Sequence, residues 1–182
     1  MPTVANVKRL PENGGRAFAL LGHSLSFKAE PEDTDDKLFL FEHRMPPALG
    51  VPAHTECNHE AFYVLEGTLE VEADGERYRL GTGEFLSLRP GVVHSLHNPG
   101  AGTTRILTLV TLASGHARFF STLGEPIEDP SNPPQPSGPP DSEDFERMAT
   151  VGRECGIEFL PPPEPKEAAE AGSGARRSPE RR

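Results

Sequence analysis

The stretch PAHTECNHEAFYVLEG (residues 52–67) holds two histidines, three glutamates and a cysteine around a short apolar run. Successive side chains of a β-strand point to opposite faces, so residues of equal parity share a face. His54, Glu56 and Glu60 point the same way if the strand is regular, whereas a turn or bulge ahead of Glu60 would reset the parity. The stretch therefore predicts a strand face that gathers one imidazole and two carboxylates.

Apolar residues continue the strand face that carries His54, Glu56 and Glu60. Phe62 and Val64 share the parity of Glu60, whereas His59 and Tyr63 have the opposite parity. We therefore expect Phe62 and Val64 to point inward and His59 and Tyr63 to point outward.

A second polar group lies in RPGVVHSLHNPG (residues 89–100), where His94 begins a strand just after a Pro-Gly turn. His97 has the opposite parity and is expected to face away from His94. If the two strands are neighbours, His94 brings a second imidazole to the first polar face.

His54, Glu60 and His94 together offer two imidazoles and one carboxylate, which suit a divalent first-row metal with open coordination positions. Glu56 adds an oxygen as a fourth donor, and the extra carboxylate favours Mn or Fe over Cu. The simpler alternative is a wet cavity lined by polar side chains, with Glu56 turned outward to solvent.

The region from residue 16 to about residue 113 consists of short β-type runs such as KLFLFEHR, TLEVEA and TRILTLVTL. Asp74-Gly75 lies between two such runs and predicts a tight hairpin. The sequence contains 18 glycines and 20 prolines, many of them between these runs, which favours an all-β sandwich or barrel. Six apolar side chains are expected in its core: Phe39, Phe41, Phe62, Val64, Leu96 and Leu109.

The composition changes after the barrel. HARFFSTLGE (116–125) predicts one or two helical turns, and DPSNPPQPSGPP (129–140) predicts an extended loop. Asp141 or Ser142 is expected to cap a helix that runs through SEDFERMATVGREC, and GIEFLPPP predicts a last extended piece. After about Pro165 the Ala-, Glu-, Gly-, Ser- and Arg-rich composition predicts disorder.

Composition and charge exclude several classes of function. The net charge of −10 argues against a broad nucleic-acid surface, because phosphate binding needs basic patches. No apolar run approaches the ~18 residues of a transmembrane helix, and residues 1–15 lack the apolar core of a signal peptide. The two cysteines do not suggest a disulfide-stapled secreted scaffold. We therefore expect a soluble, cytoplasmic protein.

The sequence resembles the cupins, a class of small β-barrel metalloproteins. Their first motif is G-x5-H-x-H-x3,4-E-x6-G, and HTECNHEAFYVLEG supplies His54, Glu60 and Gly67 at the matching spacings. Their second motif is G-x5-P-x-G-x2-H-x3-N, which GEFLSLRPGVVHSLHN (residues 83–98) follows with Gly83, Gly91, His94 and Asn98.

Three positions depart from the cupin motifs. Glu56 stands where the first motif has its second histidine, and it bears on the affinity for a metal and on its identity. Arg89 replaces the proline of the second motif, with Pro90 next to it, and Ala48 replaces the first glycine, with Gly50 nearby. These last two changes affect turns only.

The resemblance implies a cupin barrel (double-stranded β-helix or jelly roll) with short C-terminal helices. The expected divisions are an N-terminal leader (1–15), the barrel (16–115), a helical and proline-rich extension (116–162) and a disordered tail (163–182). The extension resembles that of single-domain quercetin-dioxygenase-like cupins, whose helices cover the mouth of the barrel. A homodimer is also implied.

The implied function is metal-dependent, dioxygenase-like oxidation of a small aromatic or enolic substrate. The implied ligands of Mn, Fe, Ni or Zn are His54, Glu60 and His94, with Glu56 at the second-histidine position, and Glu60 is expected to take the substrate proton. The substrate is expected to contact Phe41, His43, Phe62 and Leu96. The alternatives are a non-catalytic cupin that binds or senses a small molecule and, ranked lower, a sugar isomerase or epimerase, because Tyr63 has outward parity.

Overall fold

The protein is described by a computed structural model that covers residues 7–112, 114–134 and 141–161. Its strands are β1 (Ala17–Leu20), β2 (His23–Ala29), β3 (Leu38–Met45), β4 (Gly50–Glu56), β5 (Glu60–Glu66), β6 (Thr68–Ala73), β7 (Glu76–Gly81), β8 (Phe85–Leu88), β9 (His94–His97), β10 (Thr104–Thr111), β11 (Glu125–Pro126) and β12 (Ile157–Phe159). A short 3-10 turn (Pro31–Asp33) and two helices, α1 (Ser114–Leu123) and α2 (Ser142–Glu154), complete the described elements.

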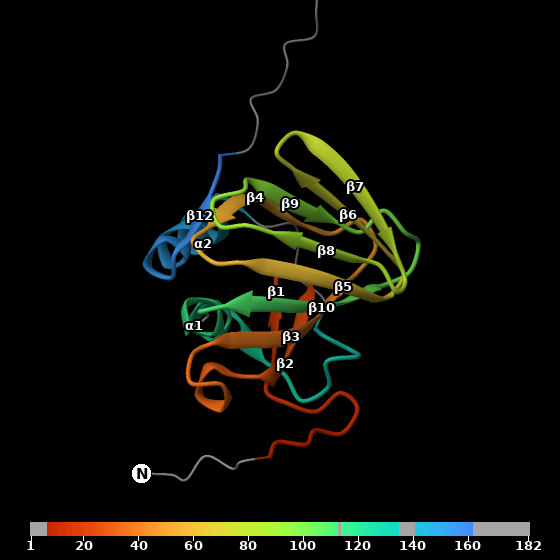
Figure 1. Cartoon of the computed structure of the whole chain (residues 1–182), viewed down its shortest axis with the longest axis vertical. Coiled ribbons are helices and arrows are strands. Elements are labelled where there is room, and N and C mark those ends of the chain that lie inside the picture. Colours follow the sequence, from red (N-terminus) through yellow and green to blue (C-terminus); the bar gives the residue numbers. More distant parts are fainter. Residues whose placement is uncertain (1–6, 113, 135–140, 162–182) are drawn as a thin grey trace, which may run out of the picture.

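Two antiparallel sheets face each other and form the body of the protein (Figure 1). One sheet has seven strands in the order β11-β1-β2-β3-β10-β5-β8, and the other has five in the order β12-β4-β9-β6-β7. The expected all-β cupin-type barrel with two short helices is therefore confirmed.

The hairpin between β6 and β7 shows how local sequence fixes the register. Asp74 and Gly75 have φ angles of 50° and 80°, so both adopt the left-handed conformation of a type I′ turn. The turn pairs Ala73 with Glu76 and sets the register of the whole hairpin. This is the hairpin that the sequence predicts.

The inner face of β10 is formed by even-numbered residues. Ile106, Thr108 and Val110 are buried, whereas Leu109 is only partly buried because its side chain has the opposite parity. The expectation that Leu109 lies in the core is therefore wrong. The other five predicted core residues are buried, namely Phe39, Phe41, Phe62, Val64 and Leu96.

Two apolar clusters fill the barrel and a third joins the C-terminal elements to it. The first lies among β5, β6 and β9 and includes Val64, Leu69 and Val71, and the second is an aromatic cluster around Phe27 and Phe39. The third packs Phe119 of α1 against Met148 of α2 and Ile157 of β12. We call α1, α2 and β12 the C-terminal cover.

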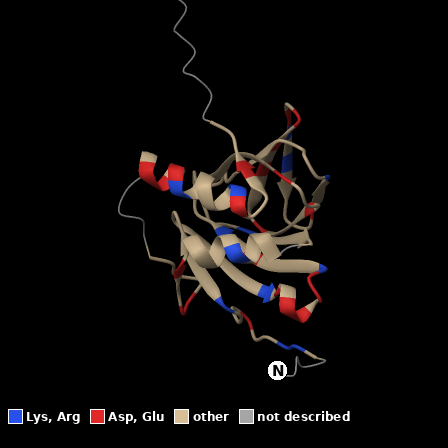
Figure 2. Cartoon of the chain, turned by 90° about the vertical axis from the view of Figure 1, so that its left-hand side faces the viewer, with Lys and Arg blue, Asp and Glu red and all other residues tan. Residues whose placement is uncertain are grey.

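The C-terminal cover lies at one end of the two sheets (Figure 1). Figure 2 faces these helices and shows charged residues on their outer side, including the acidic first turn of α2. Asp141 is the N-cap of α2, and its side chain accepts a hydrogen bond from Asp144 N at 2.9 Å, as one of the two predicted caps requires. β12 then pairs with β4, which joins Ile157 to Glu56 and Phe159 to His54 in register.

Several expectations fall on residues that the structure does not describe. The predicted tail (163–182), the first part of the predicted leader (1–6) and half of the proline-rich loop (135–140) lie outside the described residues. None of the helices in the described part of the chain is both long enough and apolar enough to cross a membrane.

Asn98 closes the loop that follows β9 and generates a prediction about stability. Its Nδ2 donates to Met45 O and Gly102 O, both at 2.8 Å, and its Oδ1 accepts from Gly100 N at 2.9 Å. The side chain is fully buried, so Asn98→Ala should lower the free energy of unfolding by about 3 kcal/mol through lost partners. Urea unfolding followed by circular dichroism measures the change. The exposed Asn132→Ala is the control, and equal stability of the two variants would contradict the prediction.

Candidate metal centre

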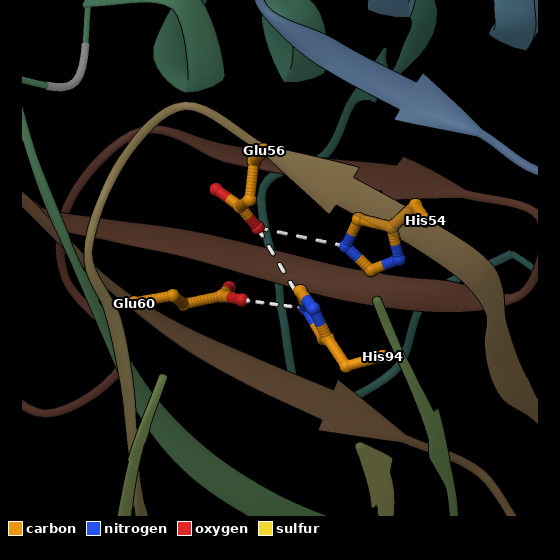
Figure 3. A group of neighbouring side chains, drawn as sticks. All are labelled: His54, Glu56, Glu60 and His94. Atoms are coloured by element: carbon orange, nitrogen blue, oxygen red, sulfur yellow. Dashed lines mark hydrogen bonds and ion pairs between the residues drawn. The ribbon is translucent and has the colours of Figure 1, made fainter. Parts of the chain in front are cut away.

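Four buried side chains converge between the two sheets: His54 and Glu56 from β4, Glu60 from the start of β5 and His94 from the start of β9 (Figure 3). We call them the His–Glu cluster. One ligand atom of each residue lies within 4.8 Å of the ligand atoms of the other three. His54 and His94 are paired in register between β4 and β9, and Glu60 reaches the cluster from the other sheet.

The bend between β4 and β5 preserves the parity on which the sequence argument rests. His54, Glu56, Glu60 and Phe62 are all buried, although residues 57–59 leave the strand conformation. The structure therefore brings together all four residues that the sequence singles out as metal ligands.

Both imidazoles are held in the tautomer that leaves Nε2 free as a ligand. His54 Nδ1 lies 2.8 Å from Pro52 O, and His94 Nδ1 lies 3.0 Å from Val92 O. Because a carbonyl oxygen only accepts, each Nδ1–H donates to it and each Nε2 presents its lone pair to the cluster. This arrangement orients imidazoles at metal sites in general.

Glu60 faces one of these lone pairs. Its Oε2 lies 3.0 Å from His94 Nε2. Burial raises the pKa of Glu60, and the negative charge of Glu56 raises it further. The shifts of opposite direction make Glu60 the more basic of the two carboxylates in the cluster.

Glu56 carries a buried negative charge. Burial alone would raise the pKa of Glu56, but close contacts with His116 and His54 outweigh it and lower the pKa. Within the described part of the chain, neither carboxylate oxygen makes a hydrogen bond of good geometry. Oε1 lies 3.5 Å from His54 Nε2 and 3.8 Å from His94 Nε2. A buried anion beside two imidazole lone pairs has the donor set and the charge that suit a divalent cation.

His116 belongs to this site and was missed by the sequence reasoning. It is a buried residue of α1, and its Nε2 lies 2.7 Å from Glu56 Oε2. The sequence places it in a helical stretch, where a lone histidine on the same face as Phe119, Phe120 and Leu123 is the pattern that points to it. That pattern does not predict that His116 contacts Glu56 of β4.

A cavity of about 240 Å³ opens beside the His–Glu cluster. Of the residues expected to contact a substrate, Phe41, His43 and Leu96 line it. Phe62 does not, because it is fully buried in the barrel core. The C-terminal cover contributes further aromatic walls, Phe119, Phe120 and Phe159.

A pair of histidines lines another part of the same cavity. His23 Nδ1 and His43 Nε2 are 2.8 Å apart, and both side chains are buried. Burial lowers the pKa of His23 to about 4, and burial together with the neighbouring His23 lowers the pKa of His43 well below its ordinary value. The pair is therefore neutral near pH 7. Sequence reasoning assigned a role to His43 but none to His23.

The remaining polar candidates lie outside the cavity. His59 and His97 are exposed, as their parity predicts, and Cys57 is an exposed free thiol. Both tyrosines of the sequence are at the surface, with 43% of Tyr63 and 39% of Tyr78 exposed. A His/Tyr acid–base pair of the kind that an epimerase needs therefore does not form in the cavity.

The barrel region is similar to known proteins. Residues 41–110 match the family model described as the cupin domain. A segment of 101 residues is 33% identical to the quercetin 2,3-dioxygenase of Bacillus subtilis (strain 168) and covers 55% of this chain and 29% of that protein. The chain therefore spans less than a third of the length of this relative.

Solved structures share the fold at low sequence identity. An RmlC-like cupin from Shewanella frigidimarina NCIMB 400 matches with a TM-score of 0.51 and 16% identity, over 59% of this chain and 93% of that chain. KdgF from Halomonas sp. matches with a TM-score of 0.50 and 16% identity, over 56% and 91% of the two chains. At such identities the likeness is one of fold alone.

The donor set predicts how the cluster responds to substitution. Dialysis against Mn²⁺ followed by elemental analysis should show metal bound to the wild type, and His94→Ala should weaken binding by at least about 100-fold because an imidazole donor is lost. Glu56→His should shift the preference from Mn²⁺ toward Ni²⁺ and Cu²⁺, since nitrogen replaces oxygen. The exposed His97→Ala is the control, and metal retention by His94→Ala equal to that of this control would refute the assignment.

The histidine pair predicts a pH dependence of stability. The unfolded chain binds a proton at His23 below about pH 6.5, whereas the folded protein binds it only below about pH 4. As the pH falls from about 6.5 to about 4, protonation of His23 in the unfolded chain should therefore lower the free energy of unfolding by about 3 kcal/mol. Denaturant titrations between about pH 7 and pH 4 should give a shallower pH dependence for His23→Gln than for wild type. His97→Gln should keep the wild-type slope, and an unchanged slope in His23→Gln would contradict the prediction.

Proposed function

Since residues 41–110 form a cupin domain, we propose that the protein is a metal-dependent, quercetin-dioxygenase-like enzyme that oxidises a small aromatic or enolic substrate. The observation that carries the proposal is the position of the His–Glu cluster, of which His54, Glu56 and Glu60 form part of the wall of a largely apolar cavity. The similarity to a protein named quercetin 2,3-dioxygenase supports the same class of chemistry.

In this proposal His54, His94, Glu56 and Glu60 hold a divalent metal through two Nε2 atoms and two carboxylates. The unsatisfied charge of Glu56 and the free Nε2 lone pairs support this assignment. Bound there, the metal supplies Lewis-acid stabilisation of an anionic substrate oxygen. The identity of the metal among Mn, Fe, Ni and Zn is part of the proposal, and the two carboxylates favour Mn or Fe.

The side chains of the cavity have separate tasks in the reaction. Glu60 takes the proton from the substrate hydroxyl, since its carboxyl group belongs to the cavity wall and lies beside His94. The resulting electron-rich enolate is the reductant and O₂ the oxidant, so the oxidation needs no further electron donor. The C-terminal cover excludes water from the site while this anion exists.

The shape and chemistry of the walls support an aromatic substrate. Phe41 and Phe120 meet edge to face with their ring centroids 5.1 Å apart, and the ring of Phe159 stacks on His54 at 5.4 Å. Such walls favour a flat apolar ring, because aromatic faces and edges pack in these arrangements. His43 and Leu96 complete the proposed contacts with the substrate.

One observation favours a second candidate function. Glu56 replaces the second histidine of the cupin motif, and a substituted ligand position is what a cupin that binds a small molecule without turnover would tolerate. In this alternative the cavity captures the same aromatic ligand and senses it. The homodimer and the cytoplasmic location predicted from the sequence stay predictions.

Oxygen consumption tests the proposal. Wild-type protein loaded with Mn²⁺ or Fe²⁺ should consume O₂ when a flavonol is added, and His94→Ala should abolish this activity. Glu60→Gln should lower kcat by about 100-fold or more, because the amide cannot accept the substrate proton. The exposed His97→Ala should retain wild-type activity.

Two results would reject the proposal that the His–Glu cluster catalyses this oxidation. Equal oxygen consumption by wild type and His94→Ala would show that the cluster is not involved. Flavonol binding by the metal-loaded wild type without any oxygen consumption would instead favour the sensing function. Isothermal titration of the flavonol separates these outcomes.

A further inference from the structure

The two oxygens of Glu56 face different partners. Oε1 lies near His54 and His94, whereas Oε2 lies 2.7 Å from His116 Nε2. Figure 3 shows the second oxygen turned away from the other three side chains of the His–Glu cluster. The carboxylate therefore connects the cluster to α1.

His116 stands outside the group of four ligand atoms, yet it is built into the site. Only 3% of its surface is exposed, its ring meets Phe120 edge to face, and it lines the cavity. Its Nδ1 is buried without a hydrogen-bond partner in the described residues, so Nε2 is the nitrogen that engages the protein.

Comparison with the two histidines of the cluster shows why Glu56 needs a contact such as that with His116. His54 and His94 are each held by a main-chain carbonyl two residues earlier on the chain. Glu56 can only accept, and in the described part of the chain no main-chain N–H donates to either of its oxygens. A group from another element must hold it, and His116 is the group in contact.

We propose that His116 is a positioning residue of the metal centre: it holds the Glu56 carboxylate and thereby couples the docking of α1 to the affinity for the metal. The inference rests on the metal site of the proposed function. The cover transmits the coupling, since Phe119 anchors α1 against Met148 and Ile157. A Cβ on Gly115 would lie 2.3 Å from Cys155 O, so the start of α1 packs closely against the end of α2.

A double-mutant cycle on Mn²⁺ affinity tests the proposal. In the wild-type background, His116→Leu should weaken Mn²⁺ binding by about 10- to 100-fold, and His116→Gln should restore part of it because its amide donates. In the Glu56→His background, His116→Leu should change the affinity by less than about 2-fold, because the group that His116 holds is gone.

Further measurements separate positioning from a merely structural role. Leu80 is a buried core residue of β7, and Leu80→Ala should destabilise the fold without changing Mn²⁺ affinity. Mn²⁺ should also slow hydrogen exchange of the α1 amides in wild type but not in His116→Leu, since coupling between two events is reciprocal.

The outcomes are distinct. Equal loss of affinity in both backgrounds, or no loss in wild type, would overturn the role of His116 while leaving the proposed function intact. Absence of Mn²⁺ binding by the wild type would overturn the metal site and this inference with it.

A second inference comes from the histidine pair, His23 and His43. In register, His43 lies opposite Ile106 of β10, whereas Glu60 lies opposite Val110. Four residues of strand separate the two levels, which corresponds to about 13 Å. Phe41 and Leu96 line the cavity that both groups share. The cavity therefore has two polar regions, and the wall between them includes Thr108 besides these apolar residues.

We infer that the histidine pair is a remote subsite that recognises a neutral hydroxyl group of the substrate, which deepens the proposed function. The 2.8 Å contact occupies His23 Nδ1 and His43 Nε2, and His23 also hydrogen-bonds to the main chain at Gly50, which leaves His43 Nδ1 for a ligand. A neutral imidazole nitrogen suits a hydroxyl group better than a carboxylate. The ligand is thus a flat aromatic molecule with one ionisable oxygen at the cluster and a hydroxyl at its far end.

Two flavonols that differ only in a hydroxyl on the ring remote from the enol test this subsite. Titration calorimetry should show that the hydroxylated compound binds wild type about 10-fold more tightly, and that His43→Phe abolishes the preference. Equal binding of both compounds by wild type would overturn the subsite alone. Absence of binding of either compound would overturn the proposed substrate class as well.

Discussion

The charge of the Glu56 carboxylate constrains three separate parts of this structure. A buried anion costs several kcal/mol unless partners compensate it. His54 lies beside it on β4, β9 brings His94 by pairing with β4, and α1 brings His116 from about sixty residues later in the chain. The barrel, the cluster and the C-terminal cover are thus organised around one side chain.

The strand periodicity of the sequence was sufficient to predict most of this arrangement. Equal parity placed His54, Glu56 and Glu60 on one face, and the structure keeps that parity through the bend. The Asp74-Gly75 turn and the cap at Asp141 depend on local chemistry and were therefore readable. The core assignment that failed, Leu109, was made from its apolar character and not from parity, which places it on the other face of β10.

The parts that could not be predicted depend on contacts between distant segments. His116 and His23 carry no motif, and their roles arise from the way α1 and β2 pack against the barrel. Phe62 is a second example: parity shows that its side chain points inward, but it does not show whether the side chain faces a cavity or the packed core. Nearness to the cavity depends on the packing of both sheets together.

The pairing of β12 with β4 has a consequence for biosynthesis. The strand that carries His54 and Glu56 has two neighbours, and one of them is made about a hundred residues later. During synthesis on the ribosome, β4 is therefore an open sheet edge until Phe159 has emerged, and such an edge invites pairing with other chains. The charged and polar side chains of β4 discourage that pairing, so the residues gathered for chemistry also protect the nascent chain from aggregation.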